Sequence, residues 1–183
     1  MKKITALLLC LAVALLFCGC SKSDKKENGD TVDLEYYVKL GRMPECEFSL
    51  GTGADEVLKK YEETMKTEDG EELYSTYKQG NRTCISTEDL LFFYDTADKE
   101  KKINYIVSYG GAYGFEPNCI LEQITNELKK GDLNAPETEL SEEETFFFPV
   151  SGGFTGLKYS FGENTACFVI DNNMLCACAL YIG

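Results

Sequence analysis

Apolar residues recur along the chain with two different periods, and each period predicts one kind of element. Residues 54–66 and 118–130 space their apolar side chains three and four positions apart, which is the pattern of a helix with one buried stripe. Thr52 can cap the first amides of the first helix, and Gly131 can end the second. Each of these helices is therefore expected to bury a single face.

Alternation of apolar and polar residues predicts antiparallel strands after each helix. Turn residues that tolerate positive φ separate several of these strands, at Gly80-Asn81, 162–164 and 171–173. The first residues of the body alternate strictly and predict a leading strand with one buried side. The predicted strands cover residues 32–40, 71–78, 82–86, 89–95, 102–109, 145–150, 154–161, 165–171 and 174–182.

The two helix-and-strand segments resemble each other, which indicates a tandem repeat. The apolar positions of the first helix recur 67 positions later, so that Val57 corresponds to Ile124. The alternating residues 103–109 recur 72 positions later as residues 175–181. The small drift between the two offsets fits one loop insertion.

The fold predicted from these elements is α+β. Two tandem helix-plus-strands repeats, about 32–109 and 110–183, build one curved antiparallel sheet with the helices on one face. The other face is expected to be partly open to solvent. This order of elements resembles the tandem-repeat fold of the β-lactamase-inhibitor protein and of small outer-membrane lipoproteins of the SmpA/OmlA type. The resemblance covers most of residues 45–183 and implies an anchored module that binds a protein through its open sheet face. It carries over no functional residue and does not imply inhibition of a β-lactamase.

The N-terminal segment follows a different pattern, that of an export signal. Lys2 and Lys3 precede an almost unbroken apolar stretch, and the small Gly19 stands directly before Cys20. The segment resembles a bacterial lipoprotein signal peptide, which implies that Cys20 receives a lipid with fatty-acid chains such as palmitate. The mature protein would then be held at the extracytoplasmic face of the cell membrane. Two alternatives stay open: an ordinary secretory signal cleaved near Ser21, and a retained membrane helix.

These assignments divide the chain into three parts. Residues 1–19 form the predicted signal peptide, residues 20–31 a solvated tether without large apolar side chains apart from the lipid site, and residues 32–183 the α+β domain. The formal net charge is -13, and removal of the two lysines with the signal peptide changes it to -15. Nucleic acid and anionic headgroups would repel so acidic a body. We therefore expect no nucleic-acid partner, and contact with the membrane only through the lipid.

The chain lacks most residues on which catalytic sites depend. It contains no histidine, which excludes Ser-His-Asp and Cys-His nucleophiles and every metal site that uses histidine. It contains no phosphate-binding or dinucleotide-binding glycine motif. The acidic residues Glu137, Glu139 and 142–144 lack the spacing of a calcium loop and are interpreted as a solvated loop. We therefore predict neither a cofactor nor a metal ion.

Cysteines offer a second candidate chemistry. The body has an even number of them, as an exported disulfide protein would. A turn at 172–173 sets Cys167 opposite Cys178, and a turn one residue earlier sets it opposite Cys176; in both registers the three sulfurs share a face of the sheet. They can be reduced thiols packed as small apolar side chains, a cross-strand disulfide, or a thiolate metal or redox site. The body cysteines are Cys46, Cys84, Cys119, Cys167, Cys176 and Cys178.

Aromatic and basic residues on predicted polar strand faces are the remaining candidates. Tyr37, Tyr74 and Lys158 are placed where they can contact a partner. Tyrosine is also common on the surface of strands without any role in binding. The sequence as a whole favours a membrane-anchored, extracytoplasmic lipoprotein that is not an enzyme and acts as a protein-binding or envelope-assembly module. One alternative is an envelope hydrolase that uses paired carboxylates on sugar polymers. The other is a thiol redox or metal-binding lipoprotein.

Overall fold

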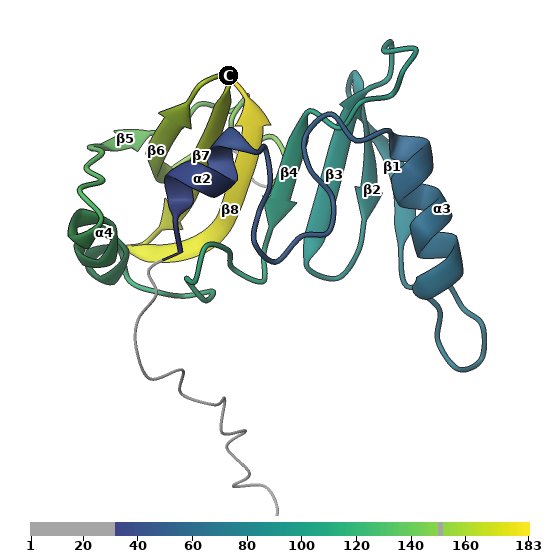
Figure 1. The fold of residues 1–183 in the computed structure, drawn as a ribbon, viewed down its shortest axis with the longest axis horizontal. Coiled ribbons are helices and arrows are strands. Elements are labelled where there is room, and N and C mark those ends of the chain that lie inside the picture. Colours follow the sequence, from purple (N-terminus) through teal and green to yellow (C-terminus); the bar gives the residue numbers. More distant parts are fainter. Residues whose placement is uncertain (1–31, 150–151) are drawn as a thin grey trace, which may run out of the picture. The chain divides into compact units, whose positions relative to one another are not determined.

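The computed structural model describes residues 32–149 and 152–183, so that the predicted signal peptide, the tether and Cys20 lie outside the described residues. The described chain is an α+β protein with three helices and one open sheet of eight antiparallel strands (Figure 1). The sheet order is β1-β2-β3-β4-β8-β7-β6-β5. Two meanders of four strands therefore meet where β4 pairs with β8.

The elements follow one another in two similar series. The helices are α2 (Leu34–Lys39), α3 (Ala54–Thr64) and α4 (Leu121–Lys130). Strands β1 to β4 follow α3, and strands β5 to β8 follow α4. Their bounds are β1 Ser75–Gln79, β2 Arg82–Ser86, β3 Leu90–Asp95, β4 Tyr105–Ser108, β5 Glu137–Glu139, β6 Thr155–Phe161, β7 Asn164–Asp171 and β8 Met174–Ile182.

The two longer helices confirm the pattern of apolar residues. In α3 the buried side chains are Ala54, Val57 and Tyr61, and in α4 they are Ile124 and Leu128. Gly131 is the C-cap of α4, as the sequence predicted. The cap predicted for α3 was wrong. Gly53 holds the N-cap position, and the Thr52 hydroxyl accepts a hydrogen bond from the Ser49 amide (3.3 Å) instead.

The predicted leading strand at residues 32–40 was also wrong, because this segment forms α2. The carboxylate of Asp33 accepts a hydrogen bond from the amide of Tyr36 (3.0 Å) and caps the helix. Leu34 and Val38 are buried, whereas Tyr36 is 55% exposed. Leu34 and Val38, four positions apart, share a side in both a strand and a helix, but a strand would place Tyr36 on that side with them. The N-cap and the burial of every fourth residue distinguish the helix.

Both faces of the central strands are apolar and buried. Phe92 and Phe93 are neighbours on β3 with no exposed surface, and they belong to different core clusters. All three helices contribute to the cluster that contains Phe92. The opposite cluster is closed by residues 140–149, which we call the cover segment, together with Phe154. The expectation of a partly open second face was therefore wrong over the centre of the sheet.

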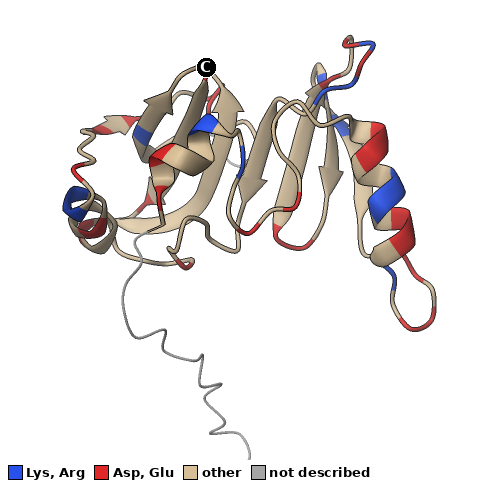
Figure 2. Cartoon of the chain, in the orientation of Figure 1, with Lys and Arg blue, Asp and Glu red and all other residues tan. Residues whose placement is uncertain are grey.

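The edges of the sheet differ from its centre. Four of the five residues of β1 are exposed, as are all three residues of β5. Figure 2 shows Lys, Arg, Asp and Glu mainly on the helices and loops, whereas the central strands carry few charges. Polar exposed edge strands border an apolar sheet that is covered on both sides. No helix within the described residues combines the length and the apolar character that a membrane span requires.

Candidate functional site

Side chains of the first meander hold the cover segment by its backbone. The side-chain amide of Gln79 donates to the backbone carbonyl of Phe146 (2.5 Å), and the hydroxyl of Tyr105 donates to the backbone carbonyl of Glu144 (3.0 Å). The hydroxyl of Tyr109 donates to the carbonyl of Phe147 (3.1 Å). The strand predicted at residues 145–150 was therefore wrong over its described residues, 145–149. They cross the sheet face, and side chains rather than a neighbouring strand satisfy these backbone carbonyls.

Aromatic rings fill the space between the cover segment and the sheet. The ring of Phe146 lies 4.8 Å from that of Phe93 and 5.2 Å from that of Tyr105, both edge-on. The ring of Phe148 stacks on that of Phe154 with centroids 4.4 Å apart. Such pairs add to the energy of burial, because the edge of one ring complements the face of the other. The phenylalanines therefore fasten the cover segment to the sheet.

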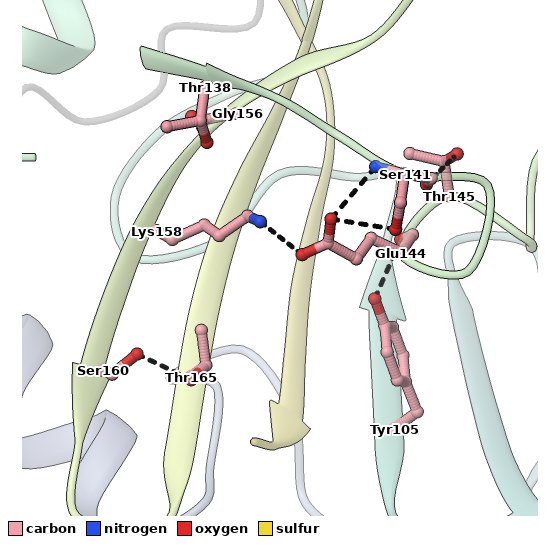
Figure 3. A network of polar contacts seen from close by, with 9 residues as sticks. All are labelled: Tyr105, Thr138, Ser141, Glu144, Thr145, Gly156, Lys158, Ser160 and Thr165. Atoms are coloured by element: carbon pink, nitrogen blue, oxygen red, sulfur yellow. Dashed lines mark hydrogen bonds and ion pairs between the residues drawn. The ribbon is translucent and has the colours of Figure 1, made fainter. Parts of the chain in front are cut away.

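One ion pair anchors the other side of the cover segment (Figure 3). Lys158 of β6 donates to the carboxylate of Glu144, which also accepts from the amide (3.0 Å) and the hydroxyl (3.1 Å) of Ser141. The side chains of Lys158 and Glu144 are 31% and 27% exposed. Burial alone would raise the pKa of Glu144, but the hydrogen bonds from Lys158 and Ser141 outweigh it and lower the pKa below its ordinary value of 4.5. The carboxylate is thus held ionised at the sheet surface.

A polar groove lies beside the cover segment at the β1–β2 turn. It has a volume of about 410 Å³. The guanidinium of Arg82 lies 3.9 Å from the centre of the Phe146 ring and 5.6 Å from that of Tyr105. Arg82 takes part in none of the five ion pairs of the described residues. The residues that line the groove are Gln79, Gly80, Asn81, Arg82, Glu143 and Phe146.

The groove stands at one end of an open sheet edge. Within the described chain, β1 pairs only with β2. A two-residue turn sets Gln79 opposite Arg82, as a pair whose backbones form hydrogen bonds with each other. In an antiparallel ladder, pairs with such hydrogen bonds alternate with pairs that lack them, so the pairs of Lys78 and Thr76 lack them. Thr76 and Lys78 therefore direct their backbone N–H and C=O groups away from β2. The edge and the groove form one continuous polar region, which is our candidate functional site.

The structure does not bring the three predicted contact residues together. Tyr37 lies half-buried on α2, edge-on to Tyr36 with ring centres 5.4 Å apart. Tyr74 precedes β1 and packs against Tyr61 (5.9 Å). Lys158 belongs to the ion pair beneath the cover segment. Tyr37 and Tyr74 pack against the helix-side core, whereas Lys158 engages the cover segment.

Sequence reasoning missed Arg82, Glu144 and Phe146. Two sequence features could have drawn attention to them. The run of three phenylalanines, 146–148, stands one residue after the acidic residues 142–144, and the chain contains only two arginines. Neither feature states which strands the segment crosses, because the contacts to Gln79 and Tyr105 span long stretches of sequence.

The predicted thiol cluster does not form on one face. Cys167 belongs to the core beneath the cover segment, whereas Cys178 belongs to the helix-side core. The turn at 172–173 is the one considered in the sequence, but a register shift after it sets Cys167 opposite Ala179. A shift of one residue reverses the face on which a side chain lies. All six cysteines of the described residues are free thiols.

Burial disfavours the thiolate form of the four buried cysteines. It raises the pKa of Cys167 to about 12 and the pKa values of Cys46 and Cys84 to about 11. It also raises the pKa of Cys178. A thiolate is the reactive and metal-binding form of cysteine. Among the residues that the structure describes, no three Cys, Asp or Glu side chains converge to hold a metal ion.

A second hollow, of about 330 Å³, carries a pair of carboxylates. It lies between the end of α3 and the β2–β3 turn and is lined by Glu88 and Asp89 together with Tyr61, Met65 and Leu73. The two acids are successive residues of one turn, and no acidic residue of another element lines this hollow. A glycosidase instead places two carboxyl groups on either side of the bond that it cleaves. This geometry gives the hydrolase alternative little support.

Comparison with known proteins gives a structural similarity and no match in sequence. No family model matches the chain, and no curated protein matches it. The crystal structure of a DUF4309 family protein (YjgB) from Bacillus subtilis has 15% sequence identity to this chain and a TM-score of 0.45. The similar region covers 81% of this chain and 97% of that chain. A similarity at this level carries no argument about function.

Replacement of Glu144 by Gln is expected to lower the free energy of unfolding by about 1–2 kcal/mol at neutral pH, because it leaves the half-buried Lys158 without its ion pair. The folded-state pKa of Glu144 lies below 4.5, so the contribution is complete above that value and is lost as the pH falls through the folded pKa. Urea unfolding of wild type and Glu144→Gln from pH 7 to pH 3 measures the difference. Glu142→Gln, on the exposed part of the same segment, is the matched control. A difference that stays constant with pH would contradict the assignment.

Alkylation of the native protein at neutral pH is expected to be slow at Cys46, Cys84, Cys167 and Cys178, because these thiols are buried and protonated. The half-exposed Cys119 and Cys176 should react first. Iodoacetamide labelling followed by peptide mass spectrometry measures the six rates. The same reaction in 8 M urea, where all cysteines are accessible, gives the reference rates. Fast labelling of Cys167 in the folded protein would revive the thiol-site hypothesis.

Proposed function

We propose that this protein is a lipid-anchored module at the extracytoplasmic face of the cell membrane, and that it binds an extended segment of another protein rather than catalysing a reaction. The observation that carries the binding function is the open edge of β1. Four of its five residues are exposed, and the outward backbone groups of Thr76 and Lys78 have no strand beside them in the described chain. A segment that adds a strand to such an edge gains main-chain hydrogen bonds without any rearrangement of the sheet.

The anchor rests on the sequence. The basic residues, the apolar stretch and the Gly19-Cys20 pair support lipid attachment at Cys20, as the resemblance to lipoprotein signal peptides implies. The tether of residues 20–31 would separate the lipid from the folded body. A module held in this way meets partners in the envelope rather than in free solution, which raises their effective concentration.

The docking position proposed here differs from the one that the sequence suggested. A partner cannot reach the centre of the second sheet face, because the cover segment occupies it. The opposite edge, β5, has only three residues and offers a shorter template. An exposed edge strand is a template for pairing with another chain, and a longer edge offers more backbone groups for it. The five-residue edge of β1 with its neighbouring groove is therefore the preferred position.

The charge of the body favours a foreign partner over a second copy. With a formal charge of -15 after removal of the signal peptide lysines, two bodies would repel each other at short range. A neutral or basic segment would meet no such barrier. We therefore assign the β1 edge to a different protein of the envelope, and self-association becomes an outcome that the test can detect.

We also propose that the two meanders descend from a duplicated unit. Val57 and Ile124, which the sequence related by 67 positions, are both fully buried in the helix-side core. Tyr105 and Val107 belong to the opposite core, as does Ala179, the counterpart of Val107 72 positions later. In this proposal β1 and β5 are equivalent edges, of which only β1 kept a useful length. The resemblance to the β-lactamase-inhibitor fold remains a proposal of the same kind.

The first test addresses the anchor. Cys20→Ala should release the protein from the membrane fraction and abolish incorporation of a radioactive fatty acid, because it removes the lipidated thiol. Cys18→Ala is the matched control and should remain labelled and membrane-bound. The measurement is fatty-acid labelling with fractionation of cells. Equal labelling of wild type and Cys20→Ala would contradict the lipid assignment.

The second test addresses the edge. Thr76→Pro removes an outward N–H and places a ring in the path of an added strand, so we expect at least a tenfold loss of cross-links from Lys78 to its partner. Thr76→Ala shortens the same side chain, keeps the N–H and should retain the cross-links. The wild type and both variants are treated with an amine-reactive cross-linker in intact envelopes and analysed by mass spectrometry.

Each outcome of this experiment has a distinct meaning. Circular dichroism establishes that both variants remain folded. Equal cross-linking of Thr76→Pro and wild type would contradict docking on β1. Cross-links only between copies of this chain would contradict a foreign partner.

A further inference from the structure

We infer that the groove at the β1–β2 turn binds a carboxylate of the partner segment through the guanidinium of Arg82. The identity of the ligand as part of a partner segment rests on the proposed docking edge, whereas the affinity of the groove for a carboxylate does not. Arg82 is unusual within this chain. The other arginine, Arg42, donates its Nε–H to the carbonyl of Cys46 (2.9 Å). No side chain of the described residues forms an ion pair with Arg82. Arg42 forms no ion pair either, so Arg82 differs from it in that its guanidinium donates no hydrogen bond to another described residue and contacts aromatic rings instead.

The guanidinium is oriented before any ligand arrives. It lies over the ring of Phe146. The backbone carbonyl of Phe146 accepts a hydrogen bond from the side-chain amide of Gln79, and the Phe146 ring packs against Phe93. Stacking of this kind leaves the N–H donors at the rim of the planar group, free for a ligand. Because the side chain is already held, binding loses less conformational freedom than it would for a mobile surface arginine.

The remaining walls of the groove favour one class of anion. A carboxylate matches the two parallel donors of a guanidinium. Phosphate does so as well, but it carries up to two charges at neutral pH. The carboxylate of Glu143 also lines the groove, and the body around it is strongly acidic. A singly charged carboxylate is therefore preferred over phosphate, while Glu143 and Asn81 can accept hydrogen bonds from the N–H groups of a peptide.

The position of Arg82 links this chemistry to the edge. Arg82 lies directly opposite Gln79, the last residue of β1. A strand added along β1 would therefore bring its end, or a side chain near its end, to the groove. The carboxylate can be the free C-terminus of the partner segment or the side chain of an Asp or Glu, and the experiment separates these two sources.

Two arginine Nε–H resonances report on the groove and on an internal control at once. The mature lipidated protein, labelled with ¹⁵N and held in detergent micelles, is titrated with N-acetylglycine as a minimal carboxylate probe. The Arg82 resonance should shift and saturate, whereas the Arg42 resonance, already bonded to a carbonyl, should not move. N-acetylglycinamide, which has a neutral amide in place of the carboxylate, should shift neither resonance. Absence of a saturable Arg82 shift, or an equal shift with the amide, would overturn the inference.

Pentapeptides identify the source of the carboxylate and separate the groove from the edge. One alanine peptide has a free C-terminus, a second is amidated, and a third is amidated but contains one Glu. We expect at least tenfold tighter binding of the first or the third peptide than of the second. Arg82→Gln should abolish this preference and Arg82→Lys should keep part of it. If the amidated peptide without Glu binds equally well, the inference is wrong.

The same titration in Thr76→Pro distinguishes failure of the groove from failure of the docking proposal. Thr76→Pro should weaken all three peptides but leave the N-acetylglycine shift of Arg82 unchanged. A lost shift of Arg82 in a folded Thr76→Pro protein would contradict an independent carboxylate site. Unchanged binding of the peptides to Thr76→Pro, together with a normal Arg82 shift, would support the groove and contradict docking on β1.

Discussion

Closure of the second sheet face by the cover segment is the constraint on which the other features of this structure depend. Phe93, Val107 and Val169 form an apolar surface opposite the helices, and no helix of the described chain lies on that side. Burial of a single large side chain such as Phe147 contributes about 2 kcal/mol, a sizeable part of the roughly 5–15 kcal/mol by which domains are stable. The phenylalanines of the cover segment therefore supply what a second layer of helices would have supplied.

This solution imposes a polar cost that the structure meets with side chains. A segment that crosses a sheet cannot bond to it as a strand, so its carbonyls need other donors. Gln79, Tyr105 and Tyr109 provide these donors, and Lys158 pairs with Glu144 in the middle of the segment. Gly156 lets Leu140 approach closely, because a Cβ at that position would lie 2.9 Å from the Leu140 side chain. The polar contacts and the glycine fix one position for the cover segment.

The same contacts shape the candidate site. Phe146 closes the sheet face with one side of its ring and lies beneath the Arg82 guanidinium. The cover segment therefore orients the arginine that we propose as a carboxylate receptor. Because both faces of the central sheet are occupied, the open positions are the edges, and β1 is the longer of the two. Stability and the proposed binding thus draw on the same few aromatic residues.

The sequence by itself determined the elements whose signals are local. The bounds of β2 and β8, the buried stripes of α3 and α4, and the two-residue turns follow from apolar spacing and turn residues that lie within a few positions of one another. The α+β class and the antiparallel sheet followed from their order. Only the tertiary structure decided that residues 34–39 form a helix, because the alternation predicted a strand and it is the burial of Leu34 and Val38 in the helix-side core, with Tyr36 exposed, that distinguishes the helix. It alone decided the face of Cys167, because one register shift reverses the alternation. The Arg82 groove likewise depends on contacts between residues more than sixty positions apart, which no local pattern of side chains encodes.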